Sequence, residues 1–280
     1  MNLTESEKYC LSEVRRHDHD RYLTTLFLPP EMRSDVLALY AFNLEIARTR
    51  EIVSEPLLGQ IRLQWWRETI EGVYGGTPRA HPVVEALAAV CQKHDIEKST
   101  LDGLIDAREA DLDDAPPPDL PALQLYAAET SGQLGILVMR AMGATDAASL
   151  EAAAKVGSAW ALVGLARSVA FHAQHQRIYI PDALLSEYEV ERRRLFDLKP
   201  SPGLNKSIER MIESAEADLA SARARKLEIS RAERKALLLA PLADRYIASI
   251  RKLGFDPFTI PASQPPHILR LAWAAWRGTY

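Results

Sequence analysis

Two pairs of acidic residues stand four positions apart, a spacing that could hold a divalent metal. Asp102 and Asp106 form one pair, and Glu109 and Asp113 form the other. Residues four apart share one face of a helix, and carboxylate oxygens are the ligands that magnesium prefers. We favour a structural role, because Asp102 follows three residues after Ser99, a residue suited to cap a helix whose N-terminus attracts acidic side chains. No displaced metal site is therefore expected here.

Two pairs of histidines offer a second kind of chemistry. His172 and His175 stand three apart, and His17 and His19 stand two apart. Imidazole groups at such spacing bind transition metals when further ligands complete the site. No cysteine or third ligand stands at motif spacing, so we interpret these histidines as partly exposed polar residues near the mouth of a cavity.

The composition is that of an ordinary soluble globular protein. The chain has 280 residues, of which 47% are hydrophobic and 26% charged, and its net charge of -4 gives no reason to expect a nucleic-acid partner. The two cysteines, Cys10 and Cys91, suit a reducing compartment and no disulfide framework. No signal-peptide core or bilayer-length apolar run is present, so a cytoplasmic protein is expected, at most peripheral on the inner face of the membrane.

Hydrophobic residues recur at helical spacing along almost the whole chain, and no stretch alternates with period two. The glycine pair Gly75–Gly76 is typical of a helix C-terminus. The interruptions are short and rich in proline, and no linker divides the chain. We therefore predict a single all-α domain over residues 1–280 with roughly ten helices. The helical spacing is clearest in 36–47, 63–73, 84–91, 101–112, 208–219 and 237–250.

Five segments resemble the squalene/phytoene synthases and stand in that family's order. The resemblance implies an isoprenoid synthase fold, a helical bundle around a central cavity. It covers residues 20 to about 185 well and the last third weakly. The segments are DRYLTTLFLPPEMRSDVLALYAF (20–42), QWWRETIEGVYGG (64–76), LIDAREADL (104–112), LYAAETSGQLGILVMRAMG (125–143) and RIYIP (177–181).

The resemblance also implies a chemistry that this chain lacks residues to perform. The family ionises allylic diphosphates with magnesium held by two DxxxD-type motifs. At the corresponding positions this sequence has Arg50 and Ser54, with Glu51 between them, and then Ser168 and His172. A guanidinium, two hydroxyls and an imidazole are poor magnesium ligands. The sequence thus predicts that these five residues line the cavity without catalytic function, metal or cofactor.

Basic residues remain around the expected cavity. Arg48, Arg67, Arg167 and Arg177 surround the lost motifs, and Tyr179 follows in the RIYIP segment. A cavity with arginines and without metal carboxylates suits an anionic or lipid-like ligand. These five residues are therefore the candidate ligand-binding residues.

A subgroup of the same family is a closer resemblance. The segments AFNLEIARTREIVSE (41–55) and AWAAWRGTY at the C-terminus resemble mitochondrial complex I assembly factors related to phytoene synthase, and their bacterial relatives. This resemblance implies assembly or stabilisation of respiratory NADH dehydrogenase, with complex I subunits as partners and an isoprenoid or lipid as ligand. The alternative is an active head-to-head prenyltransferase that uses farnesyl or geranylgeranyl diphosphate and Mg²⁺.

The C-terminal segment PHILRLAWAAWRGTY predicts an amphipathic helix with two possible uses. An aromatic stripe flanked by Arg270 and Arg277 is typical of helices that lie in a membrane interface. The same stripe could instead close the core of the domain, which is common for a last helix and is the interpretation favoured here. The stripe consists of Leu269, Ala272, Trp273 and Trp276.

Overall fold

The structure is a computed structural model that describes residues 3–261 and 268–280. Within these ranges the chain forms sixteen α-helices and no strand, which confirms the all-α prediction. The number exceeds ten partly because single residues such as Arg48 and Ser168 divide some helical stretches, and because the π segment Ala128–Gly132 separates α8 from α9. The helices are α1 (Glu5–His17), α2 (His19–Thr25), α3 (Arg33–Ala47), α4 (Thr49–Ile52), α5 (Pro56–Tyr74), α6 (Pro82–His94), α7 (Lys98–Ala107), α8 (Leu120–Ala127), α9 (Gln133–Ala141), α10 (Ala147–Arg167), α11 (Val169–Gln174), α12 (Asp182–Glu187), α13 (Arg192–Phe196), α14 (Pro202–Ala224), α15 (Leu239–Lys252) and α16 (Ile268–Arg277).

Two helix termini show how the local sequence acts. Helix α5 ends at Tyr74, and Gly76 follows with a φ of 76°, a left-handed conformation that glycine adopts without strain. The predicted cap at Ser99 is wrong, because α7 begins at Lys98 and its N-cap is Glu97, two residues earlier, in extended backbone. Ser99 lies in the first turn, and Asp102 accepts a hydrogen bond of 2.8 Å from Lys98.

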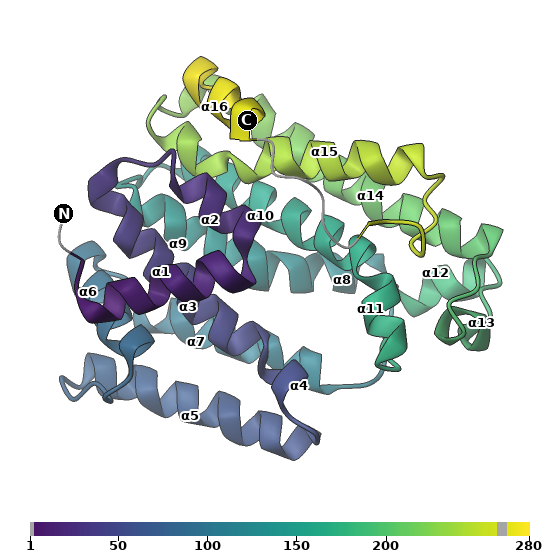
Figure 1. Ribbon diagram of the computed structural model, residues 1–280, viewed down its shortest axis with the longest axis horizontal. Coiled ribbons are helices and arrows are strands. Elements are labelled where there is room, and N and C mark those ends of the chain that lie inside the picture. Colours follow the sequence, from purple (N-terminus) through teal and green to yellow (C-terminus); the bar gives the residue numbers. More distant parts are fainter. Residues whose placement is uncertain (1–2, 262–267) are drawn as a thin grey trace.

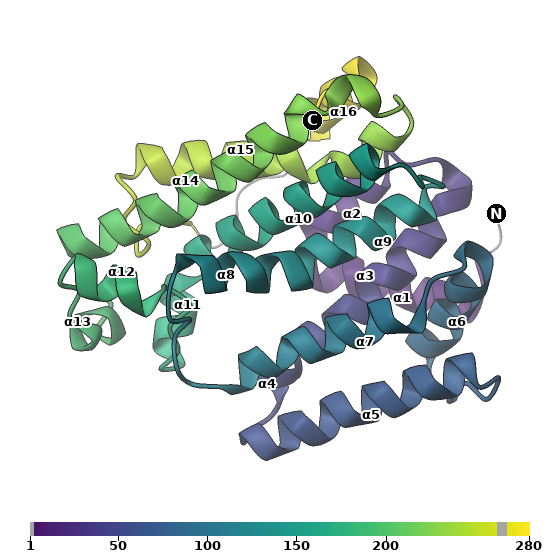
Figure 2. The ribbon, with the colours of Figure 1, turned by 180° about the vertical axis from the view of Figure 1, so that it is seen from behind.

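Helix α10 is the centre of the bundle. It packs along α14 and α15 on one side and against α9 and α8 on the other (Figure 1). Helix α3 runs between α1 and α9, and α5 lies at the edge against α7 (Figure 2). Two clusters of buried hydrophobic side chains result, one around α10, α14 and α15 and the other around α3, α6 and α7. Tyr22 and Ala236 pack against both clusters, so the two cores adjoin.

The last helix packs differently from the favoured expectation. Leu271 and Ala274 are its buried residues, whereas Leu269, Trp273 and Trp276 are exposed. The interpretation that the aromatic stripe closes the core is therefore wrong, because the opposite face of α16 does so. Pro266 and His267 of the same segment lie outside the described residues. Among the helices of residues 3–261 and 268–280, none has the length and apolar character needed to cross a bilayer.

Candidate functional site

A polar cleft lies where α3 meets α4 and α10 meets α11. It consists of two adjoining cavities, which share five lining residues. The α11 cavity, of about 380 Å³, is bounded by α4, α11 and the segment around Tyr179. The α10 cavity, of about 510 Å³, is bounded by the C-terminal halves of α3 and α10. The shared residues are Ala47, Glu51, Arg108, Tyr126 and Leu165.

Matching breaks in two helices position the residues of the cleft. Helix α3 stops at Ala47, and Arg48 leaves the helical conformation with a ψ of 2° before α4 resumes. Helix α10 stops at Arg167, and Ser168 does the same with a ψ of 8° before α11. Each break redirects the next turn, so the side chains of α4 and α11 approach the cleft from opposite sides. Both positions fall within the segments singled out in the sequence.

The five residues at the lost motif positions are distributed unevenly. Arg50, Glu51 and His172 line the α11 cavity together. Ser168 lines the α10 cavity, where Glu51 is also present. Ser54 is exposed and belongs to neither cavity. The structure therefore brings four of these residues to one cleft and leaves the fifth outside it.

The candidate ligand-binding residues divide in the same way. Arg177 and Tyr179 line the α11 cavity, and Arg48 lines the α10 cavity. The guanidinium of Arg67 is instead bound to the carboxylates of Asp106 and Glu109, each at 2.6 Å.

Arg167 is also engaged away from the cavity walls. Its guanidinium lies over the ring of Tyr246, 3.4 Å from the ring centroid, and 4.0 Å from the carboxylate of Asp20. Stacking of this kind uses the face of the cation that a ligand would otherwise contact.

The floor of the α11 cavity is a buried network that the sequence did not reveal. Asp111 lies in a 3₁₀ segment, Arg108–Leu112, and its side chain is almost fully buried. One carboxylate oxygen accepts hydrogen bonds from the hydroxyls of Tyr126, at 2.7 Å, and Tyr179, at 2.9 Å. The other oxygen lies 3.4 Å from the guanidinium of Arg108, and Arg177 donates to the Asp111 carbonyl. The network joins three segments that are distant in sequence.

Burial sets the protonation of this network. It raises the pKa of Tyr126 and of Tyr179 well above the ordinary value, and the nearby Asp111 carboxylate raises both further. The two phenols thus stay protonated and donate to Asp111. Burial also lowers the pKa of His172 to about 4, with the positive charge of Arg177 acting in the same direction. His172 is therefore uncharged at neutral pH.

The cleft carries more positive than negative side chains. The Nε atoms of Arg50, Arg108 and Arg177 are buried and have no hydrogen-bond partner in the described part of the chain. Buried donors of this kind are costly unless a partner arrives. Five guanidinium groups face three carboxylates across the two cavities: Arg21, Arg48, Arg50, Arg108 and Arg177 against Asp18, Glu51 and Asp111. The excess charge favours an anion.

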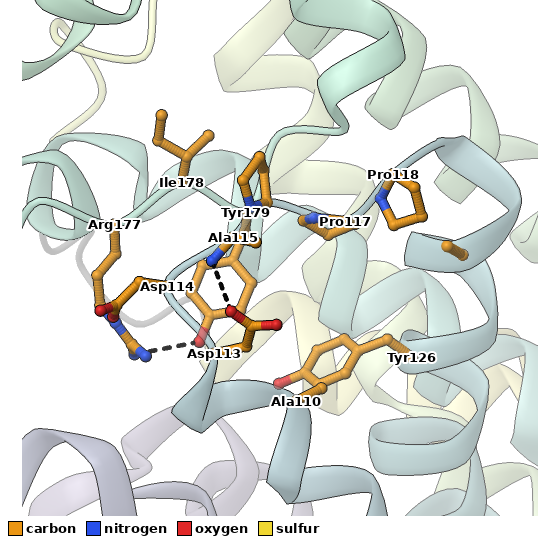
Figure 3. Close-up of a pocket in the computed structure, with 12 residues that line it drawn as sticks. Ala110, Asp113, Asp114, Ala115, Pro117, Pro118, Tyr126, Arg177, Ile178 and Tyr179 are labelled. Atoms are coloured by element: carbon orange, nitrogen blue, oxygen red, sulfur yellow. Dashed lines mark hydrogen bonds between the residues drawn. The ribbon is translucent and has the colours of Figure 1, made fainter. Parts of the chain in front are cut away.

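A third cavity of about 220 Å³ extends the cleft beneath a proline-rich loop. Figure 3 shows Tyr126 on one side of it and Arg177 with Tyr179 on the other. These three residues also line the α11 cavity, so they form the wall between the two. The rest of its lining consists mostly of apolar residues, among them Pro116, Pro117 and Ile178, together with the carboxylates of Asp113 and Asp114. A ligand with an anionic end and an apolar end would find both kinds of surface here.

The side chains of the cleft do not fit a magnesium ion. Glu51 and Asp111 are the carboxylates of the α11 cavity, and Asp111 already has two phenols and a guanidinium as partners. Across residues 3–261 and 268–280, no group of three or more histidines, cysteines, aspartates or glutamates could hold a metal. Among the acidic residues at 102–113, Asp106 and Glu109 are paired with the guanidinium of Arg67.

Comparison with known proteins places this architecture. The chain is 28% identical to the human NADH dehydrogenase (ubiquinone) complex I assembly factor 6 over 277 residues, which cover 98% of this chain and 83% of that protein. It is 30% identical to the 15-cis-phytoene synthase of a Paracoccus strain over 206 residues, 70% of this chain and 66% of that enzyme.

Solved structures show the same fold. A dehydrosqualene synthase superposes with a TM-score of 0.85 at 20% identity, covering 98% of this chain and 96% of that one. The squalene synthase HpnC from Alicyclobacillus acidocaldarius gives a TM-score of 0.79 at 18% identity, with 89% and 94% covered. The sequence model of the squalene/phytoene synthase family matches residues 14–277. The chain is therefore a member of the squalene/phytoene synthase family.

Proposed function

We propose that this protein binds an anionic isoprenoid or phospholipid without metal and without turnover, and that it takes part in the assembly of respiratory NADH dehydrogenase. The observation that carries the first half is the cleft itself. Guanidinium groups outnumber carboxylates in the α10 and α11 cavities, and Arg50 stands where the family resemblance implies a metal-binding aspartate. Direct pairing of arginine with phosphate oxygens takes the place of magnesium in this proposal.

The size and lining of the cleft favour a lipid over a small inorganic anion. The cavities together run from the guanidinium groups of Arg50 and Arg177 to the apolar side chains beneath the proline loop. A buried phosphate must be neutralised, whereas an isoprenoid or acyl chain gains by leaving water. One ligand with both parts would satisfy the two surfaces. The Nε donors of Arg50 and Arg177, which are buried and unpaired, are the groups that such a ligand would engage.

The proposal expects no turnover because of the kinds of side chain that line the cleft. Ionisation of an allylic diphosphate places charge on the leaving group, and the family resemblance implies metal ions to stabilise it. The arginines that remain are already committed in part: Arg108 to Asp111, Asn43 and Tyr126, and Arg50 to Asp114. They can hold an anion, but they are not arranged with carboxylates that would recruit magnesium.

The assembly role is supported by relatives that span almost the whole chain. Proteins named complex I assembly factor 6 from human and cattle are 28% and 29% identical to it, each over 98% of its length. The phytoene synthase relative covers 70%. The likeness to the assembly factors thus includes the C-terminal region.

Binding and turnover separate the proposal from the prenyltransferase alternative. Farnesyl and geranylgeranyl diphosphate are the probes, each measured with magnesium and with EDTA. We expect equal binding under both conditions and no diphosphate release. Arg50→Gln should weaken binding about tenfold, since a charge-assisted contact is lost. Arg210→Gln, which removes an exposed arginine paired with Glu213 on α14, is the matched control and should bind normally. Magnesium-dependent product formation would establish the alternative.

The assembly half has its own test. Deletion of the gene should lower NADH oxidation by membranes and leave NADH dehydrogenase subassemblies on native gels. Complementation with the wild-type gene should restore the full complex. Normal levels of assembled complex in the deletion strain would contradict the assembly role, whatever the binding experiment shows.

A further inference from the structure

Helix α16 presents an apolar and aromatic face with nothing packed on it. Leu269 is 86% exposed, Trp273 56% and Trp276 67%. The indole rings of the two tryptophans lie side by side, with centroids 5.2 Å apart. Ile268 is 46% exposed and precedes them on the first turn. We call these four residues the α16 patch. Soluble surfaces rarely expose such large side chains together, so the patch requires a partner.

The helix is held firmly in the orientation that exposes this face. Leu271 and Ala274 are buried on its other side. Three arginines, one from the last turn of α14 and two from the segment between α14 and α15, fasten its C-terminal end by hydrogen bonds to backbone carbonyls. Arg231 donates to Trp276, Arg234 to Gly278 at 3.4 Å, and Arg223 to Tyr280 at 2.8 Å. The face is therefore a preformed feature of the fold.

The charge around the patch has one sign. Arg270 and Arg277 are exposed on the helix itself, and Arg231 is exposed beside Trp276. The guanidinium of Arg277 lies 5.4 Å from the ring centroid of Trp273, so cation and indole are presented together. Residues 268–280 contain no aspartate or glutamate side chain. These arginines would gain nothing from a neutral apolar partner, whereas they would attract an anionic surface.

A second exposed apolar face provides the contrast. Ile52, Leu57 and Ile61 are between 52% and 61% exposed on α4 and α5, at the other side of the bundle from α16 (Figure 1). This face lies beside the exposed carboxylates of Glu51 and Glu55. Both signs of charge are present around this face, since Glu51 is paired with Arg48 at 3.7 Å. Charge therefore distinguishes the two faces, because the residues of α16 carry positive charge alone and suit acidic lipids.

We propose that the α16 patch docks the protein on the surface of an anionic lipid bilayer. The tryptophans and Leu269 enter the headgroup region, where indole rings are well accommodated, and the flanking arginines contact lipid phosphates. The helix lies in the plane of the interface and does not cross it. The proposal rests on α16 alone and stands whether or not the cleft binds a ligand.

Co-sedimentation of the full chain with lipid vesicles tests the proposal. The vesicles are phosphatidylcholine alone or phosphatidylcholine mixed with phosphatidylglycerol, each at low and high salt. We expect binding to the mixed vesicles that weakens with salt and is much lower on the neutral ones. Trp273→Ser combined with Trp276→Ser should lower the partition coefficient about tenfold, and Arg270→Gln combined with Arg277→Gln should do the same.

The control is a double variant with substitutions at similarly exposed residues on the α4–α5 face. Leu57→Ser combined with Ile61→Ser should sediment like wild type. All three double variants should keep the wild-type melting temperature, because the altered side chains are exposed. No binding of the wild type to mixed vesicles would overturn the proposal, as would unchanged binding of the tryptophan variant. A dimer in light scattering that the tryptophan variant abolishes would assign the patch to a second copy of the chain instead.

Discussion

The imidazole of His172 lies against the ring of Tyr179, with the ring centroids 4.6 Å apart. Together they form part of the wall of the α11 cavity, and Arg177 lies beside them. Burial and this guanidinium keep the imidazole neutral by lowering its pKa to about 4. His172 thus contributes shape and an aromatic contact to the cavity and no charge at neutral pH.

The depressed pKa of His172 predicts loss of stability on acidification. In the unfolded chain the imidazole has an ordinary pKa near 6.5, so between about pH 6.5 and 4 the unfolded state binds more protons than the folded state. The free energy of unfolding should fall across that interval, by at most about 3 kcal/mol from this group. Urea unfolding at a series of pH values measures the slope. His172→Gln should flatten it.

The Asp111 network predicts a large cost for a small substitution. Asp111→Asn keeps the size of the side chain but leaves the buried guanidinium of Arg108 without its counter-charge. Removal of one partner of a buried pair costs about 3 to 5 kcal/mol. Thermal unfolding should therefore show a strongly lowered melting temperature. Tyr179→Phe removes one of the hydroxyls that donate to the same carboxylate and should cost only about 1 kcal/mol. Equal effects of the two changes would contradict the ion-pair account.

Arg167 and Tyr246 predict a measurable coupling between α10 and α15. The guanidinium lies 3.4 Å from the ring centroid and is largely shielded from solvent. Such a contact is worth about 0.5 to 2 kcal/mol. A double-mutant cycle with Arg167→Met and Tyr246→Leu should give a coupling energy in this range. A coupling near zero would contradict a stabilising contact between this guanidinium and the ring of Tyr246.

The helical fold could be predicted from periodicity, but the buried face of a short helix could not. In α16 the stripe of Leu269, Trp273 and Trp276 is the more hydrophobic side, yet the side with Leu271 and Ala274 is buried. Small residues permit close approach to neighbouring helices, whereas two indoles would need a large recess. The pattern of hydrophobic residues does not predict the shape of the surface on which the helix packs, and this shape decides which face is buried.

The sequence predicted those site residues whose place in the cleft depends on their position along the backbone. It missed those whose contacts depend on how far a side chain reaches. Arg50 and His172 are set in the cleft by the helix breaks, and the family resemblance located both segments. Arg67 has a long side chain that reaches Asp106 and Glu109 instead, which no spacing rule foretells. Asp111 was missed because its phenolic partners are 15 and 68 residues away in sequence.

The glycines of the central helix predict opposite effects for the same substitution. A Cβ added at Gly157 in α10 would lie 2.2 Å from the carbonyl oxygen of Ser131, within the π-helical turn Ala128–Gly132. Backbone cannot yield as a side-chain end can, so Gly157→Ala should push the two helices apart and cost about 1 to 3 kcal/mol or more. Gly164 lies two turns further along α10, with nothing within 4 Å of its added Cβ.

Gly164→Ala is therefore the matched control, and it should raise stability by about 0.5 to 1 kcal/mol through the helix propensity of alanine. Chemical unfolding of the two variants measures both effects in one helix. If Gly157→Ala proved as stable as Gly164→Ala, the close approach of α10 to the π-helical turn would be refuted. The expected difference in sign instead identifies that approach as the reason for glycine at this point, since it brings Ser131 and Thr130 to the edge of the α10 cavity.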